Sequence, residues 1–503
     1  MPVLAAIDVG SNAMRCVVAS IDAERRVEIL DNLREPVRLG QDVFTRGVIA
    51  EGTMNRAADA FRRFAETIRA RGAIWTKALA TSATREALNK EIFIDRILQS
   101  SGIELTTIGS EEEARLIHLA VMQRINLKNK LALLVDIGGG STEITIASGE
   151  SVLSTESYKM GSVRLLQLLE KSRHDEEEFT TLVEEYVDAT RRRIIREIGD
   201  RTIDLCIGTG GNLETLGDLR RQVLGKERDT VLALTELESL LDTLCSMSFQ
   251  ERIARLGLRP DRADVIVPAA IIIHRIMRQA GTEMLQIPRV GLKDGILTDM
   301  IQELYGEKRG MDREQVLASA LALGRKYAFD EQHGLAVARF ALDLFDQTKP
   351  LHNLALEHRA MLEVAALLHD IGTFVNVTGH HKHTQYLLMA SPLVGLSREQ
   401  MAIVGNVARY HRKSFPKPQH DAYRVLSSRD RVVVSKLAAL LRLADAMDNE
   451  HATKVESFTV ELAPSELVLH LKGTEDLLLE KWALMQKAPM FEEVYSVRVS
   501  IGD

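Results

Sequence analysis

Two short loops repeat one design about 130 residues apart, and this duplication constrains the fold more than any other feature of the sequence. The first loop, Asp8–Asn12, follows the apolar run Leu4–Ile7, and the second, Asp136–Glu143, follows Leu131–Val135. Short apolar runs that end in Asp and Gly are typical of buried strands followed by tight turns. We therefore predict two β-hairpins that face each other across a cleft, with returning strands at 15–21 and 143–147.

Both loops carry residue types that bind phosphate. Glycine lets backbone N–H groups approach an anion closely, because it has no Cβ and tolerates a positive φ. The Asp at each strand end offers oxygen to a divalent cation or an attacking water, and the Ser hydroxyls can donate to phosphate oxygens. A third glycine turn follows the apolar run 203–207 and could close the same site. The predicted phosphate-binding residues are Asp8, Gly10, Ser11, Asn12, Gly138, Gly139, Gly140, Ser141, Gly208, Gly210 and Gly211.

Seven short segments resemble, in the same order, the motifs of a known family. They are Asp8–Asn12, Ala80–Arg85, Ser110–Leu116, Asp136–Glu143, Met160–Arg164, Gly208–Gly211 and Gly291–Gly295. The duplicated loops resemble those of the sugar kinase, Hsp70 and actin superfamily, in which two ribonuclease H-like domains enclose a cleft. Over nearly its whole length the chain resembles the exopolyphosphatase/guanosine pentaphosphate phosphohydrolase (Ppx/GppA) family.

Glu113 has two interpretations. Ser110 precedes it by three residues and a helical pattern begins directly after it, so the pair fits a capping box in which the Glu113 side chain accepts from the Ser110 backbone N–H. The resemblance implies a different role, because the family places its general base at this Glu, where a carboxylate takes a proton from the water that attacks the terminal phosphorus. The positive end of the helix is expected to keep Glu113 ionised.

Asp136 and Glu143 are candidate ligands for a magnesium ion. By pattern alone they fit a strand end and a hairpin, but the matching positions of the resembling family bind Mg²⁺ or serve the catalytic centre. Oxygen ligands suit this hard cation. Arg85 is a further catalytic candidate, whose guanidinium would donate to phosphate oxygens. The alternative for Arg85 is an ion pair at the start of a helix.

A second set of potential metal ligands lies in the C-terminal half. The segments 367–372 and 441–446 resemble motifs of the HD metal-phosphohydrolase superfamily, in which a His, a His-Asp pair and a distant Asp hold a divalent metal. The resemblance implies a site formed by His333, His369, Asp370 and Asp445, with His383 and His411 as further possible ligands. Imidazole and carboxylate suit several transition metals, so the identity of this second metal stays open. The alternative is a domain that serves only as scaffold.

The strand and helix patterns divide the chain into four predicted domains, so that the fold class is α/β plus all-α. Residues 1–127 and 128–305 each combine strands with helices and would form α/β layers beside the cleft. Residues 306–450 show helical periodicity, which predicts an all-helical domain. Residues 451–503 read as a small α+β domain with its last strand at 494–501. The helices expected in 306–450 are 313–327, 331–347, 357–369, 398–411 and 431–448.

Composition narrows the class of protein. Three cysteines without disulfide or metal spacing favour a reducing cytoplasm, and no apolar run reaches the roughly 18 residues that a membrane helix needs. A net charge of −7 argues against nucleic-acid binding, so anion binding is expected to be local. The richest basic stretch, Arg409–Lys436, carries eight Lys or Arg against two Asp and fits a solvated surface as well as a track for an anionic chain.

The preferred interpretation is an exopolyphosphatase, a hydrolase that releases terminal orthophosphate from inorganic polyphosphate with Mg²⁺ and Glu113 as general base. The alternative within the resembling family is removal of the 5′ γ-phosphate of guanosine pentaphosphate. Two further interpretations are a small-molecule kinase of the same superfamily fold and a nucleotide-sensing regulator with residual hydrolysis. A water-activating Glu argues against the kinase, and the intact Asp136 and Glu143 argue against the regulator. The resemblance also implies a homodimer.

Overall fold

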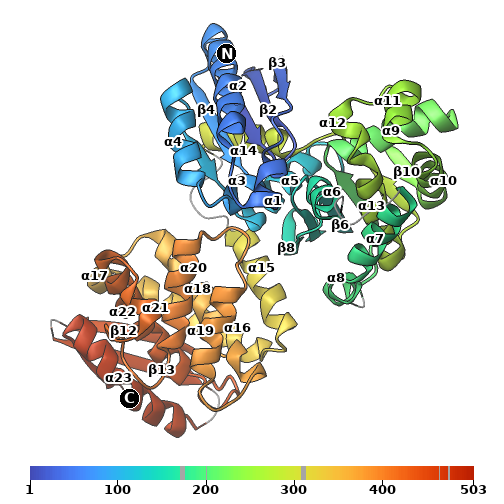
Figure 1. Cartoon of the computed structure of the whole chain (residues 1–503). Coiled ribbons are helices and arrows are strands. Elements are labelled where there is room, and N and C mark those ends of the chain that lie inside the picture. The colour runs from blue at the N-terminus through green and yellow to red at the C-terminus, as the bar shows by residue number, and fades with distance from the viewer. Residues whose placement is uncertain (170–175, 200, 307–312, 464, 474–475, 503) are drawn as a thin grey trace. The chain divides into compact units, whose positions relative to one another are not determined.

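The computed structural model describes residues 1–169, 176–199, 201–306, 313–463, 465–473 and 476–502. The chain forms two compact units, unit 1 (residues 1–308) and unit 2 (residues 309–503), which we describe separately (Figure 1). None of the described helices combines the length and the apolar character that crossing a bilayer requires.

The first sheet of unit 1 contains the first predicted hairpin. Its strands are β1 (Val3–Val9), β2 (Met14–Ile21), β3 (Val27–Glu35), β4 (Trp75–Ala80) and β5 (Leu105–Thr107), in the order β3-β2-β1-β4-β5. β1 pairs antiparallel with β2 and parallel with β4. The loop that follows β1 therefore lies beside the segment that follows β4, because the carboxyl ends of parallel strands meet at one edge of a sheet.

The second sheet of unit 1 repeats this arrangement. Its strands are β6 (Leu131–Ile137), β7 (Thr142–Ser148), β8 (Ser151–Tyr158), β9 (Leu205–Thr209), β10 (Val231–Ala233) and β11 (Met284–Gln286), in the order β10-β11-β9-β6-β7-β8. β6 pairs antiparallel with β7 and parallel with β9, as β1 pairs with β2 and β4. The duplication read from the sequence is thus a duplication of structure, and both predicted hairpins are confirmed.

Helices cover both faces of each sheet. The helices of unit 1 are α1 (Leu39–Arg46), α2 (Glu51–Ala70), α3 (Ser82–Glu86), α4 (Lys90–Ser101), α5 (Ser110–Met122), α6 (Ser162–Leu169), α7 (Glu176–Asp188), α8 (Arg191–Ile198), α9 (Gly211–Leu224), α10 (Leu234–Cys245), α11 (Phe249–Leu256), α12 (Pro260–Ala263), α13 (Ile266–Ala280) and α14 (Leu292–Leu304). In β1, Ala5 and Ile7 pack with residues of α2 and α4, whereas the alternate residues Leu4 and Ala6 pack with α5 and α14. The latter core also contains β6 and β7 residues, so α5 and α14 lie between the two sheets.

α14 is distant in sequence from the first sheet, yet it packs beside that sheet. Its Leu292 lies in the same core as Leu4 of β1 and Leu116 of α5. Gly295 permits the close approach of the two helices, because a Cβ at this position would strike the Leu116 carbonyl oxygen. The first lobe of unit 1, defined as the first sheet with α2, α4 and α5, is therefore completed by residues from the end of the unit.

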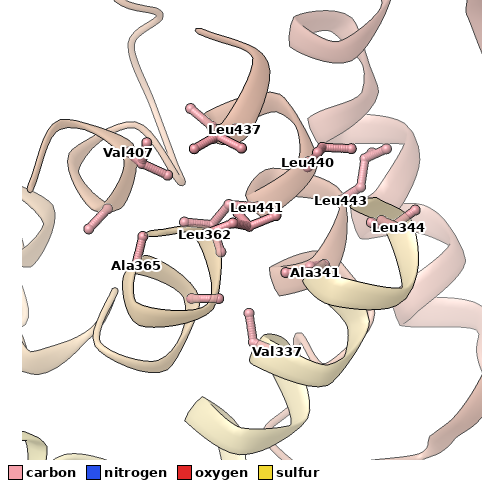
Figure 2. Close-up of a cluster of buried hydrophobic side chains, with 14 of the residues drawn as sticks. Val337, Ala341, Leu344, Leu362, Ala365, Val407, Leu437, Leu440, Leu441 and Leu443 are labelled. Carbon is pink, nitrogen blue, oxygen red and sulfur yellow. The ribbon is translucent and has the colours of Figure 1, made fainter. Parts of the chain in front are cut away.

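Unit 2 contains a helical core. Its helical elements are α15 (Arg313–Lys326), α16 (Glu331–Gln347), α17 (Lys349–His352), α18 (Leu356–Leu367), the 3₁₀ helix η2 (Ile371–Phe374), α19 (His380–Ala390), α20 (Arg398–Arg409), α21 (Asp421–Arg424) and α22 (Ser428–Ala446). Figure 2 shows Val337 of α16, Leu362 of α18, Val407 of α20 and Leu441 of α22 in one buried cluster. The five helices expected here are confirmed within a few residues at each end.

A small sheet follows the helices. β12 (Val455–Ala463) pairs antiparallel with β13 (Glu466–Gly473), which pairs parallel with β14 (Arg498–Ile501). The expected last strand at 494–501 begins later than predicted, because α23 (Leu478–Tyr495) continues through Pro489. The helix ends where Ser496 adopts a left-handed backbone with φ 54°.

Candidate functional site

A cleft of about 430 Å³ in unit 1 lies where β1, β6 and β9 end. The three predicted glycine loops line it together, because each one follows a strand whose carboxyl end is at this edge. All but one of the predicted phosphate-binding residues are in its lining, namely Asp8, Gly10, Ser11, Asn12, Gly138, Gly139, Gly140, Ser141, Gly210 and Gly211.

Gly208 is the exception. It lies within β9, where a Cβ would strike Leu213 and Leu285 in the core. This glycine is required by side-chain packing against the strand, which corrects the prediction that it binds substrate.

The remaining glycines let the loops approach one another closely. A Cβ at Gly139 would lie 3.1 Å from Ser11 Cβ and 3.1 Å from Val163 Cγ2. Gly210 has a φ of +97°, and a Cβ there would lie 2.7 Å from the Ile137 carbonyl oxygen. Side chains at these positions would therefore push apart the loops that form the floor of the cleft.

Three carboxylates, two of them buried and that of Asp136 half-buried, meet beside the loops. Glu113 comes from α5, Asp136 from β6 and Glu143 from β7, and one oxygen of each lies within 4.8 Å of the others. Thr209 Oγ1 donates to Asp136 Oδ1 at 2.6 Å, and Ser157 Oγ donates to Glu143 Oε1 at 2.9 Å. The Oε2 atoms of both glutamates are buried and accept no hydrogen bond from the described residues.

Burial and mutual repulsion raise the pKa values of these acids. Burial, with a contribution from Asp136, raises the pKa of Glu143 to about 7. Burial and the Glu143 charge hold the pKa of Glu113 well above its ordinary value, against the opposing effect of Arg85. Burial also raises the pKa of Asp136. Such a group of oxygens fits a small divalent cation such as Mg²⁺, whose charge favours the ionised form of all three acids.

The local structure at Glu113 differs from the expected capping box. α5 begins at Ser110 with Gly109 as its N-cap, so Ser110 is already inside the helix. The Glu113 N–H donates to the Gly109 carbonyl oxygen in an ordinary helical bond, while the side chain turns toward the other acids. The expectation that the helix start keeps Glu113 ionised is also corrected, because burial and Glu143 shift its pKa in the opposite direction.

Arg85, on α3, contacts Glu113. Its Nη1 lies 3.6 Å from Glu113 Oε2 and donates to the Ile108 carbonyl oxygen at 2.6 Å. This is the helix-start ion pair that the sequence allowed as an alternative to direct phosphate binding. In this arrangement the Arg85 guanidinium faces the Glu113 carboxylate, and its donation to phosphate stays a prediction.

Several cationic residues at the cleft were missed by sequence reasoning. Those in the lining are Arg15, Arg34, Arg262, Arg289 and Lys293. They come from β2, β3, α12, the turn before α14 and α14 itself, so no local motif joins them. Arg15 Nη1 lies 3.2 Å from Asp8 Oδ2, and burial together with neighbouring arginines lowers the pKa of Arg262 to about 10. Only Lys293 had a sequence signal, since it lies in the segment 291–295.

The predicted metal ligands of unit 2 also converge. His333 Nε2 lies 3.3 Å from His369 Nε2 and 3.7 Å from Asp445 Oδ1, and His369 Nε2 lies 3.4 Å from the same oxygen. Asp370 Oδ1 lies 3.7 Å from His369 Nε2 and 3.5 Å from His411 Nε2. Despite the opposing effect of burial, Asp370 and Asp445 raise the pKa of His369 to about 9. We call these five side chains, together with His380, the histidine cluster.

His380 takes the place that the sequence analysis gave to His383. Its Nε2 lies 3.0 Å from Asp370 Oδ1 and 3.1 Å from His411 Nε2. His383, one turn further along α19, is in none of the groups of potential metal ligands found among the described residues. The prediction of His383 as a possible ligand is corrected accordingly.

Every histidine of the cluster is held through its Nδ1. The Nδ1 partners are Asp448 Oδ2 for His333 at 2.8 Å, Ala366 O for His369 at 2.7 Å, Val377 O for His380 at 3.1 Å and Ala408 O for His411 at 2.7 Å. Carbonyl oxygens and the oxygens of an ionised carboxylate can only accept, so these bonds place the hydrogen of the neutral ring on Nδ1. The Nε2 lone pairs then point into the cluster, which is the arrangement of histidines that bind metals.

Comparisons with known proteins cover both units. A family model described as the Ppx/GppA phosphatase family matches residues 17–304, and one described as Ppx/GppA phosphatase, domain III, matches residues 317–488. A guanosine-5′-triphosphate,3′-diphosphate pyrophosphatase from Photobacterium profundum is 26% identical over 93% of this chain and 92% of its own length. Another with this name, from Vibrio vulnificus, is 27% identical over 90% of this chain and 88% of its own.

Solved structures resemble about three fifths of the chain. An exopolyphosphatase from Cytophaga hutchinsonii has a TM-score of 0.56 and 27% identity, covering 60% of this chain and 98% of its own. A Ppx/GppA family member from Aquifex aeolicus has a TM-score of 0.52 and 25% identity, covering 61% and 99%. Since the family models extend over most of both units and the glycine loops that suggested the resemblance do meet in one cleft, the chain belongs to the Ppx/GppA phosphatase family.

Proposed function

We propose that unit 1 hydrolyses the terminal phosphoanhydride bond of guanosine pentaphosphate and releases its 5′ γ-phosphate as orthophosphate. The main support for this proposal is the Glu113 carboxylate, which lines a cleft whose floor is formed by glycine loops. Its buried Oε2 has no hydrogen-bond donor among the described residues. The choice of substrate is supported by relatives named as pyrophosphatases of this compound, which match about nine tenths of both chains.

In this mechanism the ionised Glu113 accepts a proton from a water molecule. The water oxygen forms a bond to the terminal phosphorus, the bond from that phosphorus to the bridging oxygen breaks, and the remaining phosphate chain keeps the electron pair. The backbone N–H groups of Gly139 and Gly140 and the Lys293 ammonium, which also pairs with Asp294, would face the negative charge of the phosphoryl oxygens. Mg²⁺ held by Asp136 and Glu143 would supply further neutralisation of those oxygens.

Inorganic polyphosphate is the second candidate substrate. No aromatic side chain is among the described residues that line the cleft, so the cleft itself recognises phosphate groups and offers no ring on which a base could stack. The likeness to the exopolyphosphatase from Cytophaga hutchinsonii also supports this candidate. The kinase interpretation of the sequence is set aside, because the family is one of phosphatases.

Orthophosphate release from both substrates, measured in parallel with and without Mg²⁺, tests the proposal. We expect a higher kcat/KM for guanosine pentaphosphate and loss of release from it in Glu113→Gln. A higher kcat/KM for polyphosphate would favour the second candidate. If neither substrate released orthophosphate, the assignment of the cleft as a hydrolase site would be overturned.

A further inference from the structure

The glycine loop after β6 (138–141) turns its carbonyl oxygens toward α6. The backbone N–H groups at the start of α6 (162–164) donate to the carbonyl oxygens of Gly138 and Gly139 at 2.9 to 3.1 Å. The carbonyl and the N–H of a trans peptide point in opposite directions. The N–H groups of these two peptides therefore point away from α6. They belong to Gly139 and Gly140, which line the cleft.

The third peptide of this loop, between Gly140 and Ser141, is held by a side chain instead. Arg164 Nε donates to the Gly140 carbonyl oxygen at 2.6 Å, and Arg164 Nη2 donates to Glu86 Oε1 at 2.6 Å. The guanidinium also lies 3.9 Å from the centroid of the Phe44 ring, and Arg164 is buried. A planar guanidinium with several partners can hold a carbonyl in one direction. The Ser141 N–H, on the other side of this peptide, is thereby directed as well.

The partners of Arg164 come from the other half of the cleft. Glu86 ends α3, which follows β4 of the first sheet, and Phe44 lies on α1, which follows β3. Figure 1 shows α1, α3 and α6 close together, and α1 contacts both of the others. A Cβ at Gly140 would strike Phe44, so the glycine permits this approach. The direction of the third peptide therefore depends on the contact between the two halves.

The short helix α3 also contacts the proposed general base. Arg85, the residue before Glu86, has its Nη1 3.6 Å from Glu113 Oε2. Consecutive residues of α3 thus contact the Glu113 carboxylate and the guanidinium that holds the glycine loop. A change in the contact between Glu86 and Arg164 would be felt at both places.

We propose that Arg164 is a positioning residue that directs the Ser141 N–H toward the phosphoryl group transferred to water, and that Glu86 ties this direction to the contact between the two halves of the cleft. The inference rests on the proposed function of unit 1 and adds a donor to it. A donor that is fixed beforehand stabilises the transition state without reorganisation during the reaction. Loss of Arg164 should therefore affect the transition state more than the bound substrate.

Orthophosphate release from guanosine pentaphosphate tests this role. Arg164→Met should lower kcat about 100-fold, the effect of losing one fixed donor, and should change KM less than about threefold. Arg193→Met is the matched control. The Arg193 guanidinium also lies over a ring, 4.9 Å from the Tyr158 centroid, and pairs with Glu156 at 3.4 Å, but on the exposed surface of α8. It should keep both constants. Wild-type kcat in Arg164→Met, or a raised KM with unchanged kcat, would overturn the proposal.

A double-mutant cycle tests the part played by Glu86. Glu86→Ala should lower kcat about tenfold, because the guanidinium loses one of its partners. The double variant should be no slower than Arg164→Met alone, since Glu86 acts through Arg164. Two effects that multiplied would overturn this link. If Arg164→Met did not fold, wild-type kcat in Glu86→Ala would overturn the proposal without it.

Binding of orthovanadate distinguishes a failure of this inference from a failure of the proposed function. Five-coordinate vanadate resembles a phosphoryl group under attack, and ⁵¹V magnetic resonance in Mg²⁺ measures its binding without turnover. Arg164→Met should weaken vanadate affinity at least about tenfold and orthophosphate affinity less. Equal vanadate affinities in the variant and the wild type, or a wild type that binds no vanadate, would overturn the role of Arg164. A wild type that binds vanadate but releases no orthophosphate from either substrate would overturn the proposed function, and weaker vanadate binding by Arg164→Met would still support the donor.

Discussion

The cleft of unit 1 and the histidine cluster of unit 2 arrange their charged groups in different ways. In the cleft, Glu113 and Glu143 each leave one buried oxygen without a hydrogen bond from the described residues, and glycine loops form the floor. In the cluster, each imidazole is fixed by a bond through Nδ1 before any ligand arrives. The first arrangement suits a cation and substrate that exchange together, and the second suits a cation that is retained.

The difference teaches that the presence of buried carboxylates alone does not distinguish a site suited to an exchanging cation from one suited to a retained cation. Both places hold buried carboxylates, but only the cluster provides second hydrogen-bond partners that fix the direction of every nitrogen ligand. Oxygen donors bind Mg²⁺ through a partly hydrated shell, whereas imidazoles favour tighter binding of transition metals.

The largest expected effect comes from Glu113→Gln. Glutamine cannot accept the proton of the attacking water, so kcat should fall on the order of 10²- to 10³-fold in an orthophosphate release assay. Transition-metal content of unit 2 should not change. Glu111→Gln, on the same turn of α5, is the matched control and should keep its turnover. Wild-type kcat in the Glu113 variant would contradict its role as the general base.

The pH dependence of stability should have opposite signs in the two units of metal-free protein. Glu143 has a folded-state pKa of about 7 against an ordinary value of 4.5, so the folded state binds the proton more tightly. The free energy of unfolding of unit 1 should therefore decrease by about 3 kcal/mol as the pH rises from 4.5 to 7. Burial lowers the pKa of His411 to about 3, so unit 2 should instead gain stability as the pH rises toward 6.5.

Two tryptophans make this measurement possible, because Trp75 lies in unit 1 and Trp482 in unit 2. Urea unfolding in a chelator, followed by fluorescence of Trp482→Phe and separately of Trp75→Phe, reports each unit alone. Glu143→Gln should reduce the pH dependence of unit 1, and the remainder should come from Glu113 and Asp136, whose pKa values burial also raises. An unchanged dependence in that variant would show that other groups cause it.

Asp136→Asn should have a smaller and more selective effect. Loss of one carboxylate charge should raise the Mg²⁺ concentration for half-maximal phosphate release about tenfold, equivalent to about 1.4 kcal/mol. Saturating Mg²⁺ should restore part of the activity. A normal Mg²⁺ requirement, measured by titration, would exclude Asp136 as a ligand and would weaken the contrast with the nitrogen-rich cluster.

The smallest expected effect is that of Gly139→Ala. The new methyl would lie 3.1 Å from Ser11 Cβ and from Val163 Cγ2, so the loops have to separate slightly. A cost of about 1 kcal/mol should raise KM about fivefold with little change in metal content. Gly52→Ala, on α2 with only the Arg56 side chain within 4 Å, is the control and should keep its KM. A KM equal to that of the wild type would show that the loops tolerate the methyl group.

Much of the fold follows from periodicity in the sequence. The apolar runs before Asp8 and Asp136 predicted β1 and β6, and the 3.6-residue pattern predicted α16 at its observed bounds. These elements are long or duplicated, so the local pattern of apolar residues is enough to predict their type. The strand expected from Val494 begins later than its pattern indicates, because α23 accommodates Pro489 and continues to Tyr495.

The candidate sites were predictable only where their residues form local motifs. The glycine loops do so, whereas Arg34 and Arg262 reach the cleft from elements far apart in the chain. The positions of His380 and His383 on α19 differ by about one helical turn, roughly 5 Å. The sequence alone does not show which of these two histidines lies beside His411. The N-cap at Gly109, one residue before the apparent Ser110 cap, likewise depends on tertiary context.

The return of α14 to the first sheet has a consequence for the order in which unit 1 can fold. During synthesis, the segment 1–122 leaves the ribosome long before residues 292–304 exist, so Leu116 and its neighbours lack the helix that covers them. Contacts between segments so distant in sequence form slowly, because a long loop has to close first. The lobe that is made first is therefore completed last. A circularly permuted chain that begins with α14 should acquire a folded first lobe earlier in translation than the natural chain.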